Sequence, residues 1–299
     1  MTQTLSARLP RSSAEPAIAQ RSQHNRPPRF SPKSITSRIG LILAGVFLAL
    51  VVIAAFFPGV LAPGDPYQGD TSSVLQSPSL AHWFGTDHLG RDLFTRVVHG
   101  TSLSLQTALM AVVIAFVSGS FFGVLSGFLA GVVDQVIMRV VDVLLAIPSL
   151  LLSLALISAL GFGSLNVAIA VAVGSVATFA RIARSESLKV SGADYVDAAR
   201  SVGSSRFSIL VRHVLPNASG PIIALAVLEF GNAILAVSAL SFLGFGAPKP
   251  APEWGALVSE GRNYLYSASW LTLLPGLVVA ATVLSVHVIA RRISARKGV

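Results

Sequence analysis

The 299-residue chain has no cysteine and few charged residues. The missing cysteine excludes a disulfide framework, a thiolate metal site and a cysteine nucleophile. Charged side chains make up 12% of the residues, about half of the ~25% share that is typical of soluble domains. Hydrophobic residues make up 53%, and the mean hydropathy is +0.72. The composition therefore indicates a chain that lies mainly in lipid.

Several motifs of catalysis and nucleotide binding are absent as well. The chain has no Gly-Lys dipeptide and so no Gly-x4-Gly-Lys-Ser/Thr loop to cradle phosphates. It has no His-Glu-x-x-His zinc motif and no Gly-x-Ser-x-Gly nucleophile elbow. We therefore expect no catalytic residue and no cofactor in this chain.

Six apolar runs predict an all-α integral membrane protein with about six transmembrane helices. A span needs about 20 apolar residues, and the candidates are 39–61, 103–129, 143–160, 165–180, 221–242 and 270–290. Pro148 predicts a kink in the third run. The fourth run is short, and we expect its helix to extend past Arg181. The first run is expected to remain as an anchor and not to be cleaved as a signal peptide.

Lysine and arginine are distributed unevenly between the connections of these runs. Eighteen of the 22 fall on the side that carries both chain ends, so the positive-inside rule predicts that both termini are cytoplasmic. This distribution explains the net charge of +9 without nucleic acid. We expect a disordered basic cytoplasmic tail over 1–38, a transmembrane domain over 39–291 and a short cytoplasmic tail over 292–299.

The cytoplasmic connection 183–216 predicts a helix–turn–helix outside the bilayer. Ser191 or Asp194 is expected to cap the first helix, and Gly203 to end it in the left-handed region. Ser204 or Ser205 would cap the second helix, and Pro216 would stop it. Apolar residues recur at helical spacing in both helices: Val196, Ala199, Val202, Phe207, Leu210, Val211 and Val214.

This connection resembles the EAA loop of ABC-importer permeases, which forms a coupling helix that docks on a cytoplasmic ATPase. The likeness lies in Asp197-Ala198-Ala199, in Gly203, and in Leu215-Pro216. Asp197 stands where the family usually has Glu, and His213 where the general pattern has Ile. The resemblance implies an ATPase-coupling role for Tyr195, Asp197, Ala198, Ala199, Gly203, Leu215 and Pro216.

Three other segments resemble the dipeptide, oligopeptide and nickel branch of these permeases, in particular its second permease subunit. Segment 82–92 matches the family's outer-loop signature "GTDxxGRD" with Gly85, Thr86, Asp87, Gly90, Arg91 and Asp92. Segments 134–151 and 241–262 resemble the start of the third span and the loop between the last two spans. The chain end departs from the family's acidic tail, and Val237 stands where many members have Glu.

The resemblance implies a heteromeric importer. This chain and a second homologous permease would form the path in the lipid membrane, and two cytoplasmic ATPase subunits would bind ATP and Mg²⁺. An extracytoplasmic solute-binding protein would deliver solute to the outer loops 62–102 and 243–269. The solute stays open among dipeptides, oligopeptides, nickel chelates and other small solutes. The alternatives are a secondary transporter driven by an ion gradient, which should show repeats and polar midplane clusters, and an intramembrane enzyme.

Two sets of residues inside the apolar runs are candidates for specific roles. Gly119, Gly123, Gly127 and Gly131 recur every four residues and predict a helix-packing seam, with a place on the substrate path as the alternative. Glu229 and Asn232 share a helix face within the fifth run. An ionisable group in the bilayer is costly unless it faces protein or water. Both are therefore translocation-path candidates, and a buried, hydrogen-bonded glutamate is the alternative.

Two local interactions are also expected. Arg139 and Asp142 are three residues apart and predict a local ion pair. His82, Asp87, His88 and Asp92 allow a metal site, but we favour an ordinary loop in which Arg91 and Asp92 pair, and we assign no metal.

Overall fold

The computed structural model describes residues 35–297. The chain divides into two units, 1–38 and 39–299, and the following account concerns the second. Residues 1–34, expected to be disordered, lie outside the described residues. The elements are α1 (Ile35–Phe56), α2 (Pro58–Leu61), η2 (Thr71–Ser73), α3 (Leu93–Leu129), α4 (Gly131–Ala146), α5 (Ser149–Leu160), α6 (Ser164–Ser191), α7 (Asp194–Ser201), α8 (Arg206–Ile209), η3 (Leu210–Val214), α9 (Leu215–Phe242), α10 (Trp254–Gly261), η4 (Arg262–Tyr264) and α11 (Trp270–Lys297).

Within residues 35–297, five helices are long and apolar enough to cross a membrane: Ile39–Phe56, Leu93–Leu129, Ser164–Ser191, Arg206–Phe242 and Trp270–Arg292. A sixth span is formed if α4 and α5, which meet at a bend of 96°, are counted together. The expected all-α membrane protein is therefore confirmed. α6 also extends past Arg181 to Ser191, as the sequence predicted.

The third predicted span, 143–160, is wrong as a single kinked helix. The helix begins at Gly131, ends at Ala146, and restarts at Ser149 in a new direction. A residue before proline is pushed into the extended region by the proline ring, and Ile147 has φ −96° and ψ 130°. Pro148 therefore breaks the span where a kink was expected.

The predicted boundaries of the second and sixth spans also change. α3 begins at Leu93, ten residues before the predicted span, because the Asp92 carboxylate caps the helix by accepting a 2.7 Å hydrogen bond from the Thr95 N–H. The loop predicted over 62–102 therefore ends at residue 92. α11 continues to Lys297, so residues 292–297 of the predicted tail are helical.

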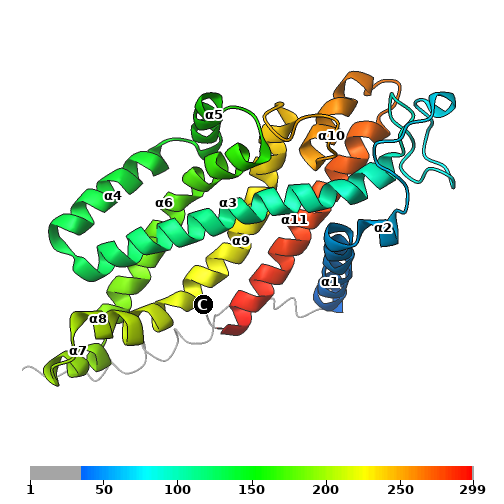
Figure 1. Ribbon diagram of the computed structural model, residues 1–299. Coiled ribbons are helices and arrows are strands. Elements are labelled where there is room, and N and C mark those ends of the chain that lie inside the picture. The colour runs from blue at the N-terminus through cyan, green and yellow to red at the C-terminus, as the bar shows by residue number, and fades with distance from the viewer. Residues whose placement is uncertain (1–34, 298–299) are drawn as a thin grey trace, which may run out of the picture. The chain divides into compact units, whose positions relative to one another are not determined.

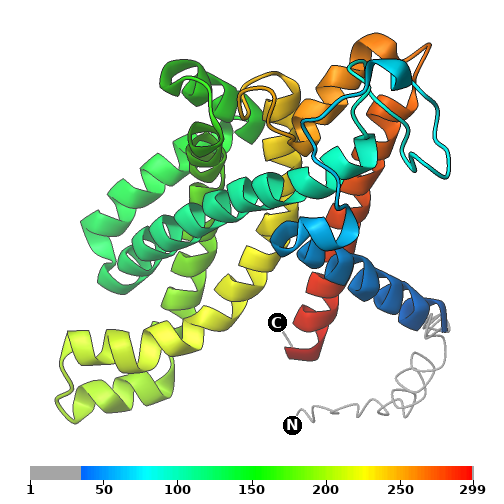
Figure 2. The same cartoon turned by 45° about the vertical axis from the view of Figure 1, so that its right-hand side comes forward.

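Three of the four glycines predicted as a seam lie at a close contact between α3 and α6. A Cβ atom on Gly119, Gly123 or Gly127 would meet the α6 backbone. The small side chains of Ala183 and Ser187 lie opposite the last two, and α3 crosses α6 in Figures 1 and 2. The seam is thus internal to this chain.

Gly131 does not belong to this seam. It has φ +63°, follows Ala130 at φ +54°, and has nothing within 4 Å of its Cβ position. Gly131 instead forms the tight turn from α3 into α4, which needs a left-handed backbone.

Ion pairs join α4 to α6. Asp134 of α4 accepts two hydrogen bonds from the Arg184 guanidinium of α6, and Asp142 accepts one of 2.6 Å from Arg181. The predicted Arg139–Asp142 pair is therefore wrong, because α6 places Arg181 against Asp142 and Arg139 is exposed.

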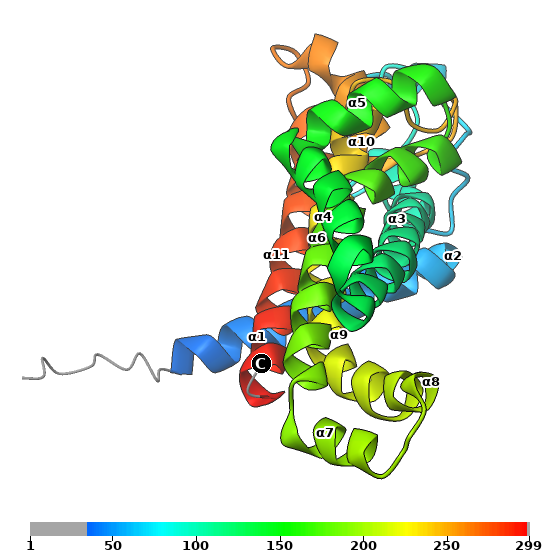
Figure 3. The same ribbon diagram turned by 90° about the vertical axis from the view of Figure 1, so that its left-hand side faces the viewer.

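The helical bundle of residues 39–297 has a different structure at each of its two ends. α7 and α8 lie at one end, and α10 lies at the other with the 62–92 loop (Figures 1 and 3). α9 runs between these ends (Figure 1). We call them the α7–α8 end and the α10 end.

Candidate functional site

The α7–α8 hairpin contains the predicted glycine turn. Gly203 has φ +83°, its N–H donates to the Arg200 carbonyl at 3.0 Å, and the Ser204 N–H donates to the Ala199 carbonyl at 3.1 Å. These two bonds form a Schellman motif, which satisfies carbonyls at a helix end and favours glycine in the left-handed position. The predicted end of the first helix is confirmed.

The helix starts in the hairpin follow the prediction only in part. Ser205 caps α8 as expected, accepting a 3.2 Å hydrogen bond from the Ser208 N–H. Neither Ser191 nor Asp194 caps α7: Ser191 ends α6, Ala193 is the N-cap and Asp194 is the first helical residue. The first expectation fails because α6 extends far beyond its apolar run.

Pro216 does not stop the second helix, contrary to the sequence prediction. The Leu215 N–H donates to the Leu210 carbonyl in a π-helical turn, and the chain passes through η3 into α9. Proline is tolerated in the first turn of a helix because N–H groups there lack intrahelical partners. The result is one helical stretch, Arg206–Phe242, with a π-helical turn next to the hairpin. Such turns are frequent at functional sites.

Some apolar side chains of the hairpin are buried and others are exposed. Val196, Ile209 and Val214 are at most 2% exposed and hold the hairpin against the bundle. Val202 and Phe207, which belong to the same helical spacing, are 83% and 74% exposed. Exposed apolar side chains of this kind mark protein-interaction surfaces when they gather in a patch.

The residues assigned to ATPase coupling lie together in and beside this hairpin. Tyr195, Ala198, Leu215 and Pro216 are exposed, and Ala199 is half-buried against the core. Asp197 accepts a 2.8 Å hydrogen bond from Arg200 at the surface. Their coupling role stays a prediction.

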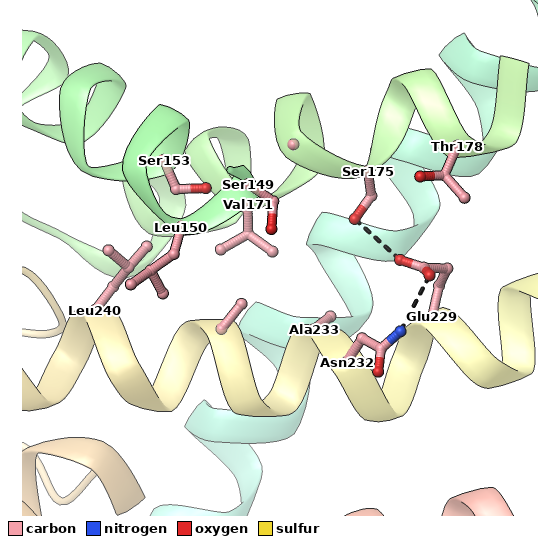
Figure 4. A pocket seen from close by; sticks show the side chains of 12 residues that line it. Ser149, Leu150, Ser153, Val171, Ser175, Thr178, Glu229, Asn232, Ala233 and Leu240 are labelled. Atoms are coloured by element: carbon pink, nitrogen blue, oxygen red, sulfur yellow. Dashed lines mark hydrogen bonds between the residues drawn. The ribbon is translucent and has the colours of Figure 1, made fainter. Parts of the chain in front are cut away.

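Glu229 and Asn232 line a cavity of about 230 Å³ between α5, α6 and α9 (Figure 4). Asn232 Nδ2 donates to Glu229 Oε1 and Ser175 Oγ donates to Glu229 Oε2, both at 3.1 Å. The predicted shared face is thus confirmed. The cavity is lined by Ser149, Leu150 and Ser153 of α5; Val171, Gly174, Ser175 and Thr178 of α6; and Glu229, Asn232, Ala233, Ala236 and Leu240 of α9.

The serine and threonine residues of this cavity were not singled out from the sequence. Ser149 and Ser153 are four residues apart, and Ser175 and Thr178 are three apart, so each pair shares a helix face. Hydroxyl groups on one helix face within an apolar run were the sequence signal that could have identified these residues. Only the bend before α5 brings the first pair to the second.

The outer-loop signature surrounds a buried ionic cluster, which we define as Asp87, Arg91, Arg96 and Glu260. Asp87 Oδ2 lies 2.7 Å from Arg91 Nε and 2.9 Å from Arg96 Nη1, which is 2.7 Å from Glu260 Oε2. The four side chains are at most 10% exposed. The cluster ties the 62–92 loop and α3 to α10. Arg96 was not among the predicted site residues.

Burial alone would raise the pKa of Asp87. The backbone N–H groups of Arg91 and Leu89 and the Arg91 guanidinium outweigh burial and hold that pKa below its usual value. Asp87 is therefore an ionised, structural carboxylate.

The other signature residues shape the loop around the ionic cluster. Gly85 and Gly90 have φ +74° and +73°, and a Cβ at either would meet the backbone of another loop residue. Buried Thr86 accepts a 2.8 Å hydrogen bond from the Gln76 N–H.

The expected Arg91–Asp92 pair is wrong. Arg91 pairs with Asp87, and Asp92 caps α3 and lies 2.9 Å from His82 Nδ1. Within residues 35–297, no three His, Asp or Glu side chains are grouped so that they could hold a metal ion.

The helical arrangement is similar to that of solved ABC transporters. An inward-facing methionine transporter, MetNI, matches with a TM-score of 0.55 and 18% identity, covering 67% of this chain and 95% of that one. An amino acid ABC transporter matches with a TM-score of 0.53 and 18% identity, covering 67% and 94%. At this identity the likeness concerns the fold alone.

Sequence relatives are closer. The probable D,D-dipeptide transport permease DdpC of Escherichia coli is 41% identical over 84% of this chain and 82% of its own length. The dipeptide transport permease DppC of Alkalihalophilus pseudofirmus is 40% identical over 84% and 81%. The glutathione transport permease GsiD of Pectobacterium atrosepticum is 37% identical over 83% of each. The predicted resemblance to peptide-importer permeases is confirmed.

A family model, the inner membrane component of binding-protein-dependent transport systems, matches residues 119–299. This segment contains the hairpin and all three walls of the cavity. Together with relatives that are similar over most of their length, the match establishes that the chain belongs to this family of transport permeases.

Proposed function

We propose that this chain is one of two permease subunits of an ATP-driven importer for dipeptides or similar short peptides. The relatives' names support the solute class, since they are described as permeases for dipeptides, D,D-dipeptides and glutathione. Family membership favours this function over a secondary transporter driven by an ion gradient.

The observation that carries the proposal is the continuous helical connection between the hairpin and the cavity. The hairpin exposes apolar side chains beyond the bundle, and the second half of the hairpin continues as one helical stretch, Arg206–Phe242. At 1.5 Å per residue, ~35 Å separate Arg206 from Glu229 along this stretch. A helix that is displaced at the hairpin therefore also displaces one wall of the cavity, as in rigid-body switching.

In the proposed mechanism, two cytoplasmic ATPase subunits bind ATP and Mg²⁺ and close against the hairpins of both permeases. ATP hydrolysis belongs to those subunits, and this chain contributes no catalytic residue. The α7–α8 end faces the cytoplasm with both termini, in agreement with the lysine and arginine distribution. A solute-binding protein docks at the α10 end and releases solute to a path that Glu229 and Asn232 line together with the second permease.

Affinity purification from the native membrane in mild detergent, followed by mass spectrometry, tests this proposal. We expect a second permease, nucleotide-binding subunits and a solute-binding protein to be recovered. The ligand of the binding protein would identify the solute. Recovery of an intact chain without any nucleotide-binding subunit, under conditions that preserve other transporter complexes, would contradict the proposal.

A further inference from the structure

Glu229 is an acidic group without a cationic partner in the part of the chain that the structure describes. Its carboxylate accepts hydrogen bonds from Ser175 and Asn232, both neutral. The ion pairs of the described residues do not include it. A carboxylate inside the bilayer is costly unless it is paired or faces water. Glu229 therefore retains capacity for a positive charge.

The position of Glu229 gives a small solute access to this charge. The residue is half-buried at one end of the cavity, next to exposed Asn232. At 1.5 Å per residue, Glu229 lies ~20 Å along α9 from its end at Phe242, well inside the span. Ion pairing with water-soluble groups can occur at that depth only through the cavity or through another subunit.

The cavity is polar at one end and more apolar at the other. Ser175, Thr178, Glu229 and Asn232 gather at the polar end, and Leu150, Val171 and Leu240 lie toward the other end together with the hydroxyl groups of Ser149 and Ser153 (Figure 4). A primary ammonium group has three donors and no acceptor, which suits a carboxylate with free acceptor sites. The apolar end suits a side chain attached beside that ammonium group.

We infer that this cavity binds the free ammonium group of the transported solute at Glu229, with Ser175 and Asn232 holding the carboxylate in place. The inference rests on the proposed importer function and adds to it the chemical group that the permease recognises. A solute with a free amino terminus can form this ion pair with Glu229, whereas an N-acylated solute cannot. The rival is an ion pair between Glu229 and the second permease.

The lack of cysteine allows a direct test with one introduced thiol. Thr178→Cys places the thiol in the cavity wall, opposite Glu229 on the neighbouring helix. The assembled transporter in nanodiscs is reacted with the cationic reagent 2-aminoethyl methanethiosulfonate or the anionic 2-sulfonatoethyl methanethiosulfonate. Modification of this chain is followed by mass spectrometry, and rates are normalised to those with a free thiol.

We expect the cationic reagent to react faster than the anionic one by roughly 25-fold, because one charge about 4 Å away in water changes a rate roughly fivefold, upward for the cation and downward for the anion. Glu229→Gln, which keeps the shape and removes the charge, should abolish the preference. L-alanyl-L-alanine should slow the cationic reaction, while its N-acetyl derivative should not, and Glu229→Gln should remove that difference. Glu186→Gln is the matched control on α6, since Glu186 pairs with Lys189 outside the cavity, and it should leave the preference intact.

Equal preference for the cationic reagent with Glu229 and with Glu229→Gln would overturn the inference. Equal protection by the two peptides would do so as well. Loss of the second permease from purified Glu229→Gln would support the rival ion pair and likewise overturn it. ATP-dependent dipeptide uptake by the unmodified transporter is measured in parallel. Absence of this uptake would refute the proposed function, and the charge preference of the thiol reaction could still be measured.

Discussion

At the scale of single residues, Asp87 and Glu229 are two carboxylates in very different surroundings. Asp87 is buried, and two guanidinium groups lie within 3 Å of its Oδ2 atom. Among residues 35–297, Glu229 accepts hydrogen bonds from two neutral donors, and it lines a cavity. A buried, fully paired carboxylate contributes to structure, whereas the proposed solute contact of Glu229 rests on its lack of a cationic partner among residues 35–297.

Asp87→Asn should destabilise the protein by about 3–5 kcal/mol at neutral pH, because Glu260 then remains as one carboxylate for two buried guanidinium groups, those of Arg91 and Arg96. The folded-state pKa of Asp87 is lowered. Its contribution is therefore full above the unfolded pKa of about 3.9 and is lost as the pH falls through the lower folded value. Thermal unfolding in detergent at several pH values should show the difference between wild type and variant shrinking below about pH 4.

The control for that experiment is Asp70→Asn in the same loop. Asp70 is exposed and bonded to Ser72 and Ser73, so little change in melting temperature is expected. A loss of stability in Asp70→Asn as large as that in Asp87→Asn would contradict the structural role of the ionic cluster. A stability difference between Asp87→Asn and wild type that does not change with pH would contradict it as well.

Gly123→Ala should destabilise the fold by about 1–3 kcal/mol, the usual cost of overpacking. The added methyl group would meet the Ala180 carbonyl of α6, so the helices must separate. Gly276→Ala on α11 is the control, because nothing lies within 4 Å of its Cβ position. Equal melting temperatures for the two variants would contradict the seam.

At the scale of helices, the sequence predicted which segments are helical better than it predicted where each helix begins and ends. Apolar runs mark the segments that lipid favours, and every run contains helix in the structure. They do not mark where a helix begins. α3 starts ten residues early because Asp92 caps it, and α9 joins η3 because a π-helical turn precedes Pro216. Both depend on local hydrogen bonds that hydropathy does not report.

Pairings between helices were the least predictable part of the site. The Arg139–Asp142 spacing suggested a local pair, but Asp142 contacts Arg181 across α4 and α6. The cavity likewise needs the 96° bend that brings α5 to α6 and α9. By contrast, Gly203 and the Glu229–Asn232 face were predictable, because each depends on residues close in sequence.

Gly203→Pro should reduce ATP-dependent uptake at least tenfold while the subunit still inserts. Proline fixes φ near −65°, so it cannot adopt the φ of +83° that turns α7 into α8. Ala199→Glu should act similarly, since it places a charge on the packed side of α7. Uptake is measured together with the amount of subunit in the membrane.

Gly220→Ala serves as the control, because nothing lies within 4 Å of its Cβ position in α9 and its backbone is helical. Its uptake should match that of the wild type. Normal uptake by Gly203→Pro and Ala199→Glu would refute the coupling role of the hairpin.

At the scale of the whole molecule, the described helices connect three separate sites. The ionic cluster braces loops at the α10 end, the cavity lies between α5, α6 and α9, and the hairpin lies at the α7–α8 end. The stretch Arg206–Phe242 passes through the last two. This stretch therefore joins the hairpin to the cavity, and it is the element through which the proposed coupling would act.

The measurement that tests this account most directly is site-specific photocrosslinking from the hairpin. Ala198→Cys, exposed on α7, carries a benzophenone attached to the only cysteine of the chain, and Val113→Cys on an exposed face of α3 is the control. We predict that illuminated membranes containing the labelled Ala198→Cys variant yield an adduct with a nucleotide-binding subunit, that its yield changes on ATP addition, and that Val113→Cys yields none. No such adduct from Ala198→Cys, in a complex that still contains the nucleotide-binding subunit, would contradict it.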